Sequence, residues 1–132
     1  MLLVDTSVWV DLFRDKTGKR RITLRKAIDG DDVVLCRFTQ LELLQGSRDE
    51  KEWALLISYL EGQDYLEASE TAYGAAARIY FDLRRQGLTV RSPIGCLIAQ
   101  LAIEHDATLV HRDRDFEAIA RVRPLSQLRL EW

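Results

Sequence analysis

Apolar and polar residues follow one another along this chain in short blocks that predict alternating strands and helices. Three apolar runs have the length and residue types of buried strands, Leu2–Val4, Val33–Cys36 and Thr108–Val110, and Leu125–Leu128 predicts an edge strand. Between these runs, apolar residues recur at the three- and four-residue spacing of a helix face. The order of elements predicts an α/β fold, a three-layer α/β/α domain with a central, mainly parallel, twisted sheet.

Capping and turn residues set the limits of the predicted helices. Helices are expected from a Ser7 cap through Phe13, over Ile22–Ile28, from Thr39 onward, over Ser69–Gln86 and around Phe116–Ala120. Gly46 and Ser47 divide the segment after Thr39 into a helical hairpin. In the helix over Ser69–Gln86, an apolar stripe predicts a core-facing side, with Ser69 as the cap and Gly87 beyond the end.

The composition bounds the size and setting of the protein. A chain of 132 residues with 47% hydrophobic residues is long enough for one packed core, so we expect a single domain over residues 1–132. The net charge of −2 gives no overall attraction to nucleic acid, so any such binding depends on local basic patches. Cys36 and Cys96 lack a metal-binding spacing and are expected to be reduced and buried. No leader or membrane-length apolar run is found, which predicts a soluble, cytoplasmic protein with no membrane contact.

Carboxylates stand close to the ends of the predicted strands. Asp5 ends the first strand, Glu42 lies on the helix after the second, and Asp113 and Asp115 follow a later strand. Ligands of open parallel sheets gather at the carboxyl ends of the strands, where these acids can converge. Such oxygen donors suit Mg²⁺ or Mn²⁺ and can support phosphodiester hydrolysis. Taken singly, each acid also fits a helix cap, a turn or a solvated helix face.

Four segments around these acids resemble a known family. They are Leu3-Val4-Asp5-Thr6-Ser7, Thr39-Gln40-Leu41-Glu42-Leu43-Leu44, Arg91-Ser92-Pro93-Ile94-Gly95-Cys96-Leu97-Ile98-Ala99 and His111-Arg112-Asp113-Arg114-Asp115-Phe116. In order and spacing they resemble the PIN domain of VapC-type toxins. The resemblance implies an Mg²⁺- or Mn²⁺-dependent endoribonuclease that cleaves a tRNA or rRNA loop, forms a homodimer and is neutralised by a VapB-like antitoxin.

The same resemblance assigns roles to individual residues. It implies that Asp5, Glu42 and Asp113 hold the metal and that Asp115 is a further catalytic acid. It also implies that the hydroxyls of Thr6 or Ser7 support the metal site.

Gly95 departs from the family pattern, which has an aspartate at this position. Ser92 suits the N-cap and Pro93 the first turn of a helix, so residue 95 is the third helical residue, where an acid is favoured. Glycine costs about 0.5–1 kcal/mol relative to alanine within a helix. We therefore expect weakened metal binding and reduced cleavage, whether Gly95 arose by drift or by deliberate substitution.

Basic residues provide candidate RNA contacts. Arg112 and Arg114 alternate with the acids after the predicted strand, where they can position a phosphate or moderate repulsion between carboxylates. Arg20 and Arg21 belong to the densest basic segment, which can follow an RNA backbone or form a solvated helix face.

Two other functions are compatible with parts of the sequence. A catalytically inactive homologue that binds an antitoxin or RNA is the main alternative, because Gly95 removes an expected acid. An aspartyl phosphatase would have a second acid two residues after Asp5, where Ser7 stands instead. His105 and His111 lack a metal-ligand spacing, so structural roles are favoured for both.

Overall fold

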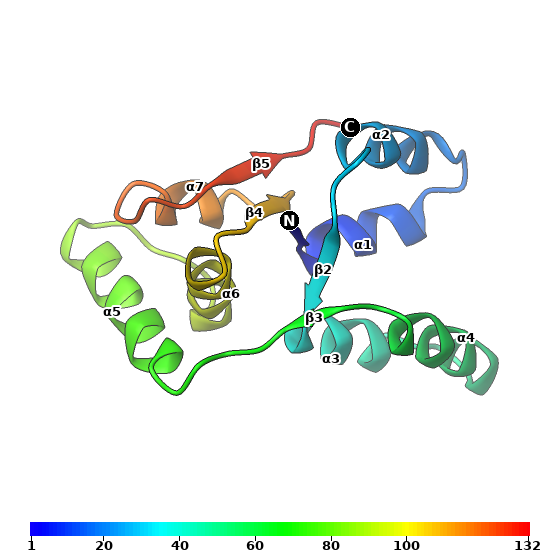
Figure 1. Cartoon of the computed structure of the whole chain (residues 1–132), viewed down its shortest axis with the longest axis horizontal. Coiled ribbons are helices and arrows are strands. Elements are labelled where there is room, and N and C mark those ends of the chain that lie inside the picture. The colour runs from blue at the N-terminus through cyan, green and yellow to red at the C-terminus, as the bar shows by residue number, and fades with distance from the viewer.

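A five-stranded parallel sheet with helices on both faces organises the chain (Figure 1). The computed structural model describes residues 1–132, and the strands are β1 (Leu2–Val4), β2 (Val33–Cys36), β3 (Tyr65–Leu66), β4 (Thr108–His111) and β5 (Gln127–Arg129). They lie in the order β3-β2-β1-β4-β5, and every neighbouring pair is parallel. The predicted α/β/α architecture is therefore confirmed.

Seven helices connect and cover the strands. They are α1 (Thr6–Arg14), α2 (Lys19–Ala27), α3 (Arg37–Gln45), α4 (Glu50–Glu61), α5 (Ala72–Arg85), α6 (Pro93–Glu104) and α7 (Asp115–Ile119). The predicted break at Gly46 separates α3 from α4, and Gly87 follows α5 with a φ of 72°. None of the helices combines the length and apolar character needed to cross a membrane.

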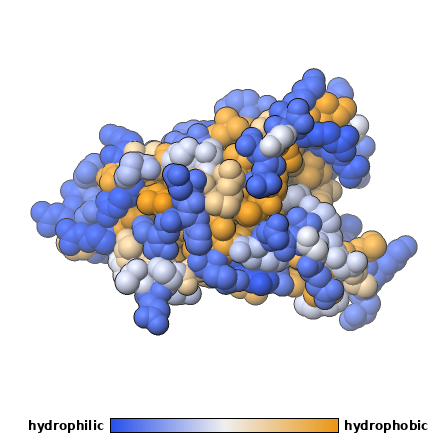
Figure 2. All heavy atoms as spheres, viewed as in Figure 1, coloured by the Kyte–Doolittle hydropathy of each residue, from blue (hydrophilic) through white to orange (hydrophobic).

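The two faces of the sheet bury different residues of the same strands. Leu3 packs into the larger core beneath α5, α6 and α7, whereas Leu2 and Val4 pack with residues of α1, α2, α3 and α4 on the other face. Successive strand residues point to opposite faces, so three residues of β1 serve both cores. Figure 2 shows apolar side chains gathered near the middle of this view, over the strands, with hydrophilic side chains around them.

Several local predictions were wrong. Asp5, not Ser7, caps α1, and α5 begins at Ala72 rather than at a Ser69 cap. The hydroxyl of Ser69 bonds instead to the carboxylate of Glu104 at 3.1 Å. The last strand begins two residues later and ends one residue later than expected, and β3 was not predicted at all.

The sheet topology places the candidate acids at one edge. Asp5 follows β1 directly, α3 follows β2 directly, and Arg112 follows β4 directly. Because β1 lies between β2 and β4 and all three run parallel, their carboxyl ends meet around the end of β1. This edge is where parallel α/β proteins bind ligands.

Candidate functional site

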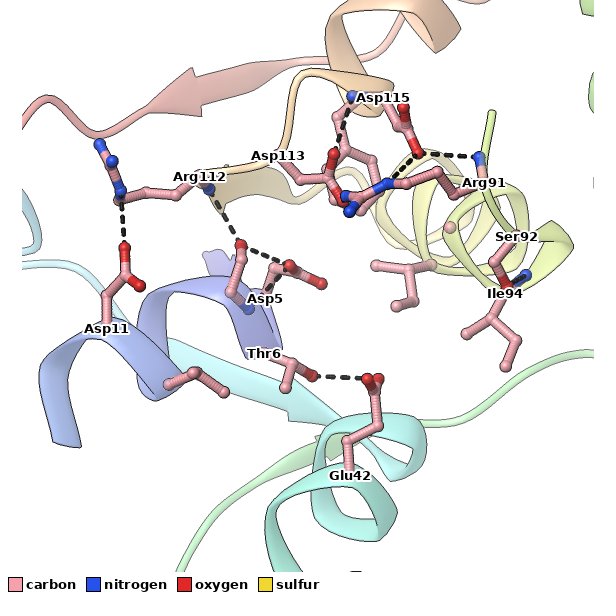
Figure 3. Close-up of a pocket in the computed structure, with 15 residues that line it drawn as sticks. Asp5, Thr6, Asp11, Glu42, Arg91, Ser92, Ile94, Arg112, Asp113 and Asp115 are labelled. Atoms are coloured by element: carbon pink, nitrogen blue, oxygen red, sulfur yellow. Dashed lines mark hydrogen bonds and ion pairs between the residues drawn. The ribbon is translucent and has the colours of Figure 1, made fainter. Parts of the chain in front are cut away.

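A cavity of about 560 Å³ lies at this edge of the sheet (Figure 3). The four acids singled out in the sequence and the glycine at position 95 all line it, together with two hydroxyl residues of α1: Asp5, Glu42, Asp113, Asp115, Gly95, Thr6 and Ser7. They come from α1, α3, α6, α7 and the junctions that follow β1 and β4. The fold therefore brings together residues that lie up to 110 positions apart.

Asp5 is buried at the centre of this arrangement, with 7% of the residue exposed. Its carboxylate accepts hydrogen bonds from the Ser7 amide at 3.0 Å and the Ser7 hydroxyl at 2.6 Å. Burial raises the pKa of Asp5, an effect that these two bonds oppose and that the charge of Asp113 reinforces. The Ser7 hydroxyl also accepts a bond from the Arg112 amide at 3.0 Å, which ties the end of β1 to the end of β4.

Glu42 reaches the cavity from α3 and is held by Thr6. The Thr6 hydroxyl lies 3.3 Å from a carboxylate oxygen of Glu42 and 3.0 Å from the hydroxyl of buried Thr39. Partial burial and the charge of Asp5 raise the pKa of Glu42. Two anions that disfavour each other's ionisation are stabilised by a cation placed between them.

Asp113 and Asp115 are joined through Arg91, which precedes α6. The Arg91 guanidinium donates to Asp113 at 2.6 Å and to Asp115 at 3.3 Å, and the Arg91 amide donates to Asp115 at 3.0 Å. The Asp115 amide in turn donates to the Asp113 carboxylate at 2.9 Å. These contacts fasten the loop before α6 to the loop after β4 (Figure 3). The guanidinium side chain remains 78% exposed although it pairs with two acids.

His111 supports Asp113 from within the core. Its Nδ1 accepts a hydrogen bond from the Asp113 amide at 3.0 Å, so the proton resides on Nε2, which donates to the Gln127 side chain at 2.6 Å. The residue is fully buried. These contacts fit the structural role expected for His111.

The structure separates the four candidate RNA-binding arginines. Arg112 points to Asp11 of α1, with its Nε 2.8 Å from the carboxylate, and its Nη1 donates to the Leu130 carbonyl at 2.6 Å. Arg114 lies outside the acid cavity, in an adjoining groove. Arg20 and Arg21 lie on α2 and do not line the cavity, although the Arg20 guanidinium donates to the backbone carbonyl of Asp11, a cavity residue, at 3.2 Å. RNA binding by these residues stays a prediction.

Two residues of the cavity were missed. Arg91 bridges two acids only because the α5–α6 and β4–α7 loops are adjacent in space, which no local sequence pattern shows. Asp11 also lines the cavity, and its position four residues after Ser7 on α1 was an available signal, because residues four apart share a helix face.

Gly95 faces the cavity from the first turn of α6. The Ser92 hydroxyl accepts a bond from the Ile94 amide at 3.1 Å, which confirms the predicted cap and makes Gly95 the third helical residue. A Cβ atom at this position would lie 3.9 Å from Cε1 of Phe116, an ordinary contact distance. The position therefore has room for a Cβ atom without overlap.

The donor set determines which cofactor the cavity suits. No three carboxylate, imidazole or thiol side chains lie close enough to bind a metal ion together. The available donors are carboxylate and hydroxyl oxygens, which suit Mg²⁺ or Mn²⁺. Mg²⁺ commonly keeps several waters and takes only one or two carboxylates. The cavity thus fits a hydrated ion better than one enclosed by protein ligands.

Comparisons with known proteins agree with this fold and chain length. The PIN domain family model matches residues 2–122. Ribonuclease VapC11 from Mycobacterium tuberculosis (strain ATCC 25618 / H37Rv) is 38% identical over 128 residues, covering 95% of this chain and 96% of that protein. Among solved structures, VapBC2 from Rickettsia felis, bound to a DNA fragment from its promoter, aligns with a TM-score of 0.78 at 18% identity over 98% of each chain. VapBC-1 from nontypeable Haemophilus influenzae aligns with a TM-score of 0.75 at 18% identity, over 97% of this chain and 96% of that one.

Proposed function

Because this chain belongs to the PIN-domain family and, within it, to the VapC ribonucleases, we propose that it is the metal-dependent endoribonuclease toxin of a toxin–antitoxin pair. Its substrate is a cellular RNA, with a tRNA or rRNA loop as the expected target. The observation that carries the proposal is the meeting of four carboxylates from three separate segments in one cavity at the carboxyl edge of the sheet.

Each group in the cavity has a distinct task in this proposal. Asp5, Glu42 and Asp113 would hold a hydrated Mg²⁺ or Mn²⁺, partly through its bound waters because the three carboxylates do not converge on one point, with Ser7 orienting Asp5 and Thr6 orienting Glu42. The ion, when bound, lowers the pKa of a water nucleophile and offsets charge on the phosphate. The protein residues fix where the cation and the RNA phosphate meet, and Asp115 keeps Asp113 in place through its amide.

We assign a reduced activity to this chain because Gly95 contributes no carboxylate. Residue 95 lines the same cavity as Asp5, and a Cβ atom there meets no close neighbour. Fewer anionic groups attract a cation less strongly and leave its water less well positioned. Restoring an acid at residue 95 is therefore expected to increase metal affinity and cleavage together.

A VapB-like antitoxin is the proposed partner, and the toxin itself is proposed to be a homodimer. Support for the partner comes from the fold, which is shared with chains of VapBC complexes. Purification of the chain alone and with a co-expressed antitoxin, followed by light scattering on a sizing column, measures both assemblies. A monomer at micromolar concentration would contradict the homodimer.

RNA cleavage with Mn²⁺ or Mg²⁺ tests the catalytic proposal. The proteins compared are the chain as it stands, Gly95→Asp, and Gly95→Asp combined with Asp5→Asn, with Asp31→Asn in the Gly95→Asp background as a matched control. Asp31 is exposed and lies in the turn before β2, outside the cavity. Efficient cleavage by Gly95→Asp and its control, lost with Asp5→Asn or a chelator, is the expected result. Equal cleavage by all four proteins would refute it.

A binding module without catalysis is the second candidate, and Gly95 is the observation that favours it. In this case the chain acts by occupying RNA or by holding its antitoxin. If the folded, antitoxin-free Gly95→Asp protein cuts no RNA while it still binds RNA or antitoxin, this second function replaces the first.

A further inference from the structure

A second groove of about 900 Å³ opens beside the acid cavity. The two share Arg91, Arg112, Asp113 and Asp115, so the groove is continuous with the candidate active site. The remaining lining comes mainly from the loop before α6, from α7 and the turn after it, and from β5. Figure 1 shows β5 running beside β4, with α7 close to both.

Arginine dominates this groove. Five arginines line it against three acids: Arg91, Arg112, Arg114, Arg121 and Arg129 face Asp113, Asp115 and Glu117. This excess of positive charge is local, because the whole chain carries a net charge of −2. The net charge of the whole chain does not attract anions over long distances, but this local cluster of arginines can bind an anion that reaches the groove.

Three of these arginines already have carboxylate partners. Arg91 pairs with Asp113 and Asp115, Arg112 pairs with Asp11, and Arg129 pairs with Glu117 at 3.1 Å.

The other two arginines of the groove, Arg114 and Arg121, are exposed and form no ion pair or side-chain hydrogen bond. Their guanidinium groups are therefore free to contact an external anion without first breaking an internal pair.

We propose that this groove binds the phosphate backbone of the RNA strand next to the scissile phosphate, with Arg114 and Arg121 as its principal contacts. This inference rests on the proposed ribonuclease function. A strand entering the acid cavity meets the negative charge of Asp5 and Glu42, and cations beside the cavity offset that repulsion. Backbone contacts of this kind position a single strand without reading its sequence.

Binding of a fluorescein-labelled single-stranded RNA, measured by anisotropy in a chelator, tests the groove separately from cleavage. The test variant is Arg114→Gln with Arg121→Gln. The matched control is Arg48→Gln with Lys51→Gln, which removes the same amount of charge from two exposed residues around the start of α4, outside both the cavity and the groove. Circular dichroism and thermal melting establish that both variants are folded.

The groove variant is expected to bind at least about tenfold more weakly at low salt, while the α4 control binds like the parent. Two lost phosphate contacts should also lower the slope of log affinity against log salt by about 1.4. Binding by the groove variant equal to the parent, an equal loss in the α4 control, or no binding by the parent would each overturn the proposal.

Cleavage in the Gly95→Asp background distinguishes a failure of the proposed ribonuclease function from a failure of the groove assignment. If binding depends on Arg114 and Arg121 but no metal restores cleavage, the groove stands and the catalytic proposal fails. If cleavage is restored while RNA affinity is unchanged by the loss of Arg114 and Arg121, the catalytic proposal stands and the groove assignment fails.

Discussion

Replacing Gly95 by alanine, asparagine and aspartate tests the position of residue 95 through stability rather than activity. A Cβ here meets only Phe116 Cε1 at 3.9 Å, so alanine introduces no overlap. Residue 95 lies in the first turn of α6, where glycine has a larger backbone entropy cost than alanine. Gly95→Ala should therefore stabilise the protein by about 0.5–1 kcal/mol. For a chain of 132 residues, this raises Tm by roughly 2–4 °C.

The comparison of Gly95→Asp with Gly95→Asn isolates the added charge. The exposed amides of the α6 N-terminus favour the anion by about 0.3–1 kcal/mol. Repulsion from Asp5 and Glu42 opposes this by an amount on the order of 1 kcal/mol. In a chelator the aspartate variant should thus be no more stable than the asparagine variant.

Mn²⁺ is expected to reverse that order. At about ten times the dissociation constant, bound metal stabilises the aspartate variant by about 1.4 kcal/mol, which corresponds to roughly 5 °C. Differential scanning calorimetry of the four proteins, with and without Mn²⁺, measures each step. A loss of stability in Gly95→Ala would refute the packing argument. Equal Mn²⁺ shifts in the aspartate and asparagine variants would refute the assignment of residue 95 to the metal site.

Three further predictions concern charges at the site and a buried thiol. The raised pKa of Asp5 means that the folded state holds this proton more tightly than the unfolded state, so Asp5→Asn should be more stable than the parent at pH 7. In urea unfolding, the advantage should shrink as the pH falls toward 3.8, the ordinary pKa, and an advantage that grows in acid would contradict this reasoning. Arg91→Gln removes a cation that competes with a metal for Asp113 and Asp115, so calorimetric titration should show that Mn²⁺ binds up to about fivefold more tightly. Weaker Mn²⁺ binding would contradict this and would mean that the ion pairs of Arg91 hold the two acids in their binding positions. Burial raises the pKa of Cys96 to about 11, so iodoacetamide at pH 8 should modify it only after unfolding, as followed by intact mass.

The sequence was sufficient for the features that depend on strand ends. Short apolar runs located β1, β2 and β4, and a parallel order forces the residues after such strands to one edge. This is why Asp5 and Asp113 could be grouped although they lie far apart in the chain. Ser92 and Pro93 likewise located the start of α6, because a cap followed by proline acts within one helical turn.

Features that depend on contacts between loops could not be read from local patterns. The two residues of β3 are too few to show an alternation, so their strand pairing appears only beside β2. Ser69 has the side chain of a helix cap, but its hydroxyl bonds to Glu104 of α6 instead. Arg91 became a site residue only when the loop before α6 met the loop after β4. In each case a tertiary contact decided the outcome.

The charge arrangement of the cavity connects Gly95 with the stability of the metal-free protein. Two of the four candidate acids, Asp113 and Asp115, share the single cation Arg91, whereas Asp5 and Glu42 have no cationic partner and have raised pKa values. A carboxylate at residue 95 would add a further anion to this unbalanced pair, and the energetic cost would fall on the protein whenever no cation is bound. Glycine removes that cost, but the cavity then attracts a cation less strongly. Metal affinity and metal-free stability are therefore expected to change in opposite directions at this one position, as in other sites where function requires unfavourable charge.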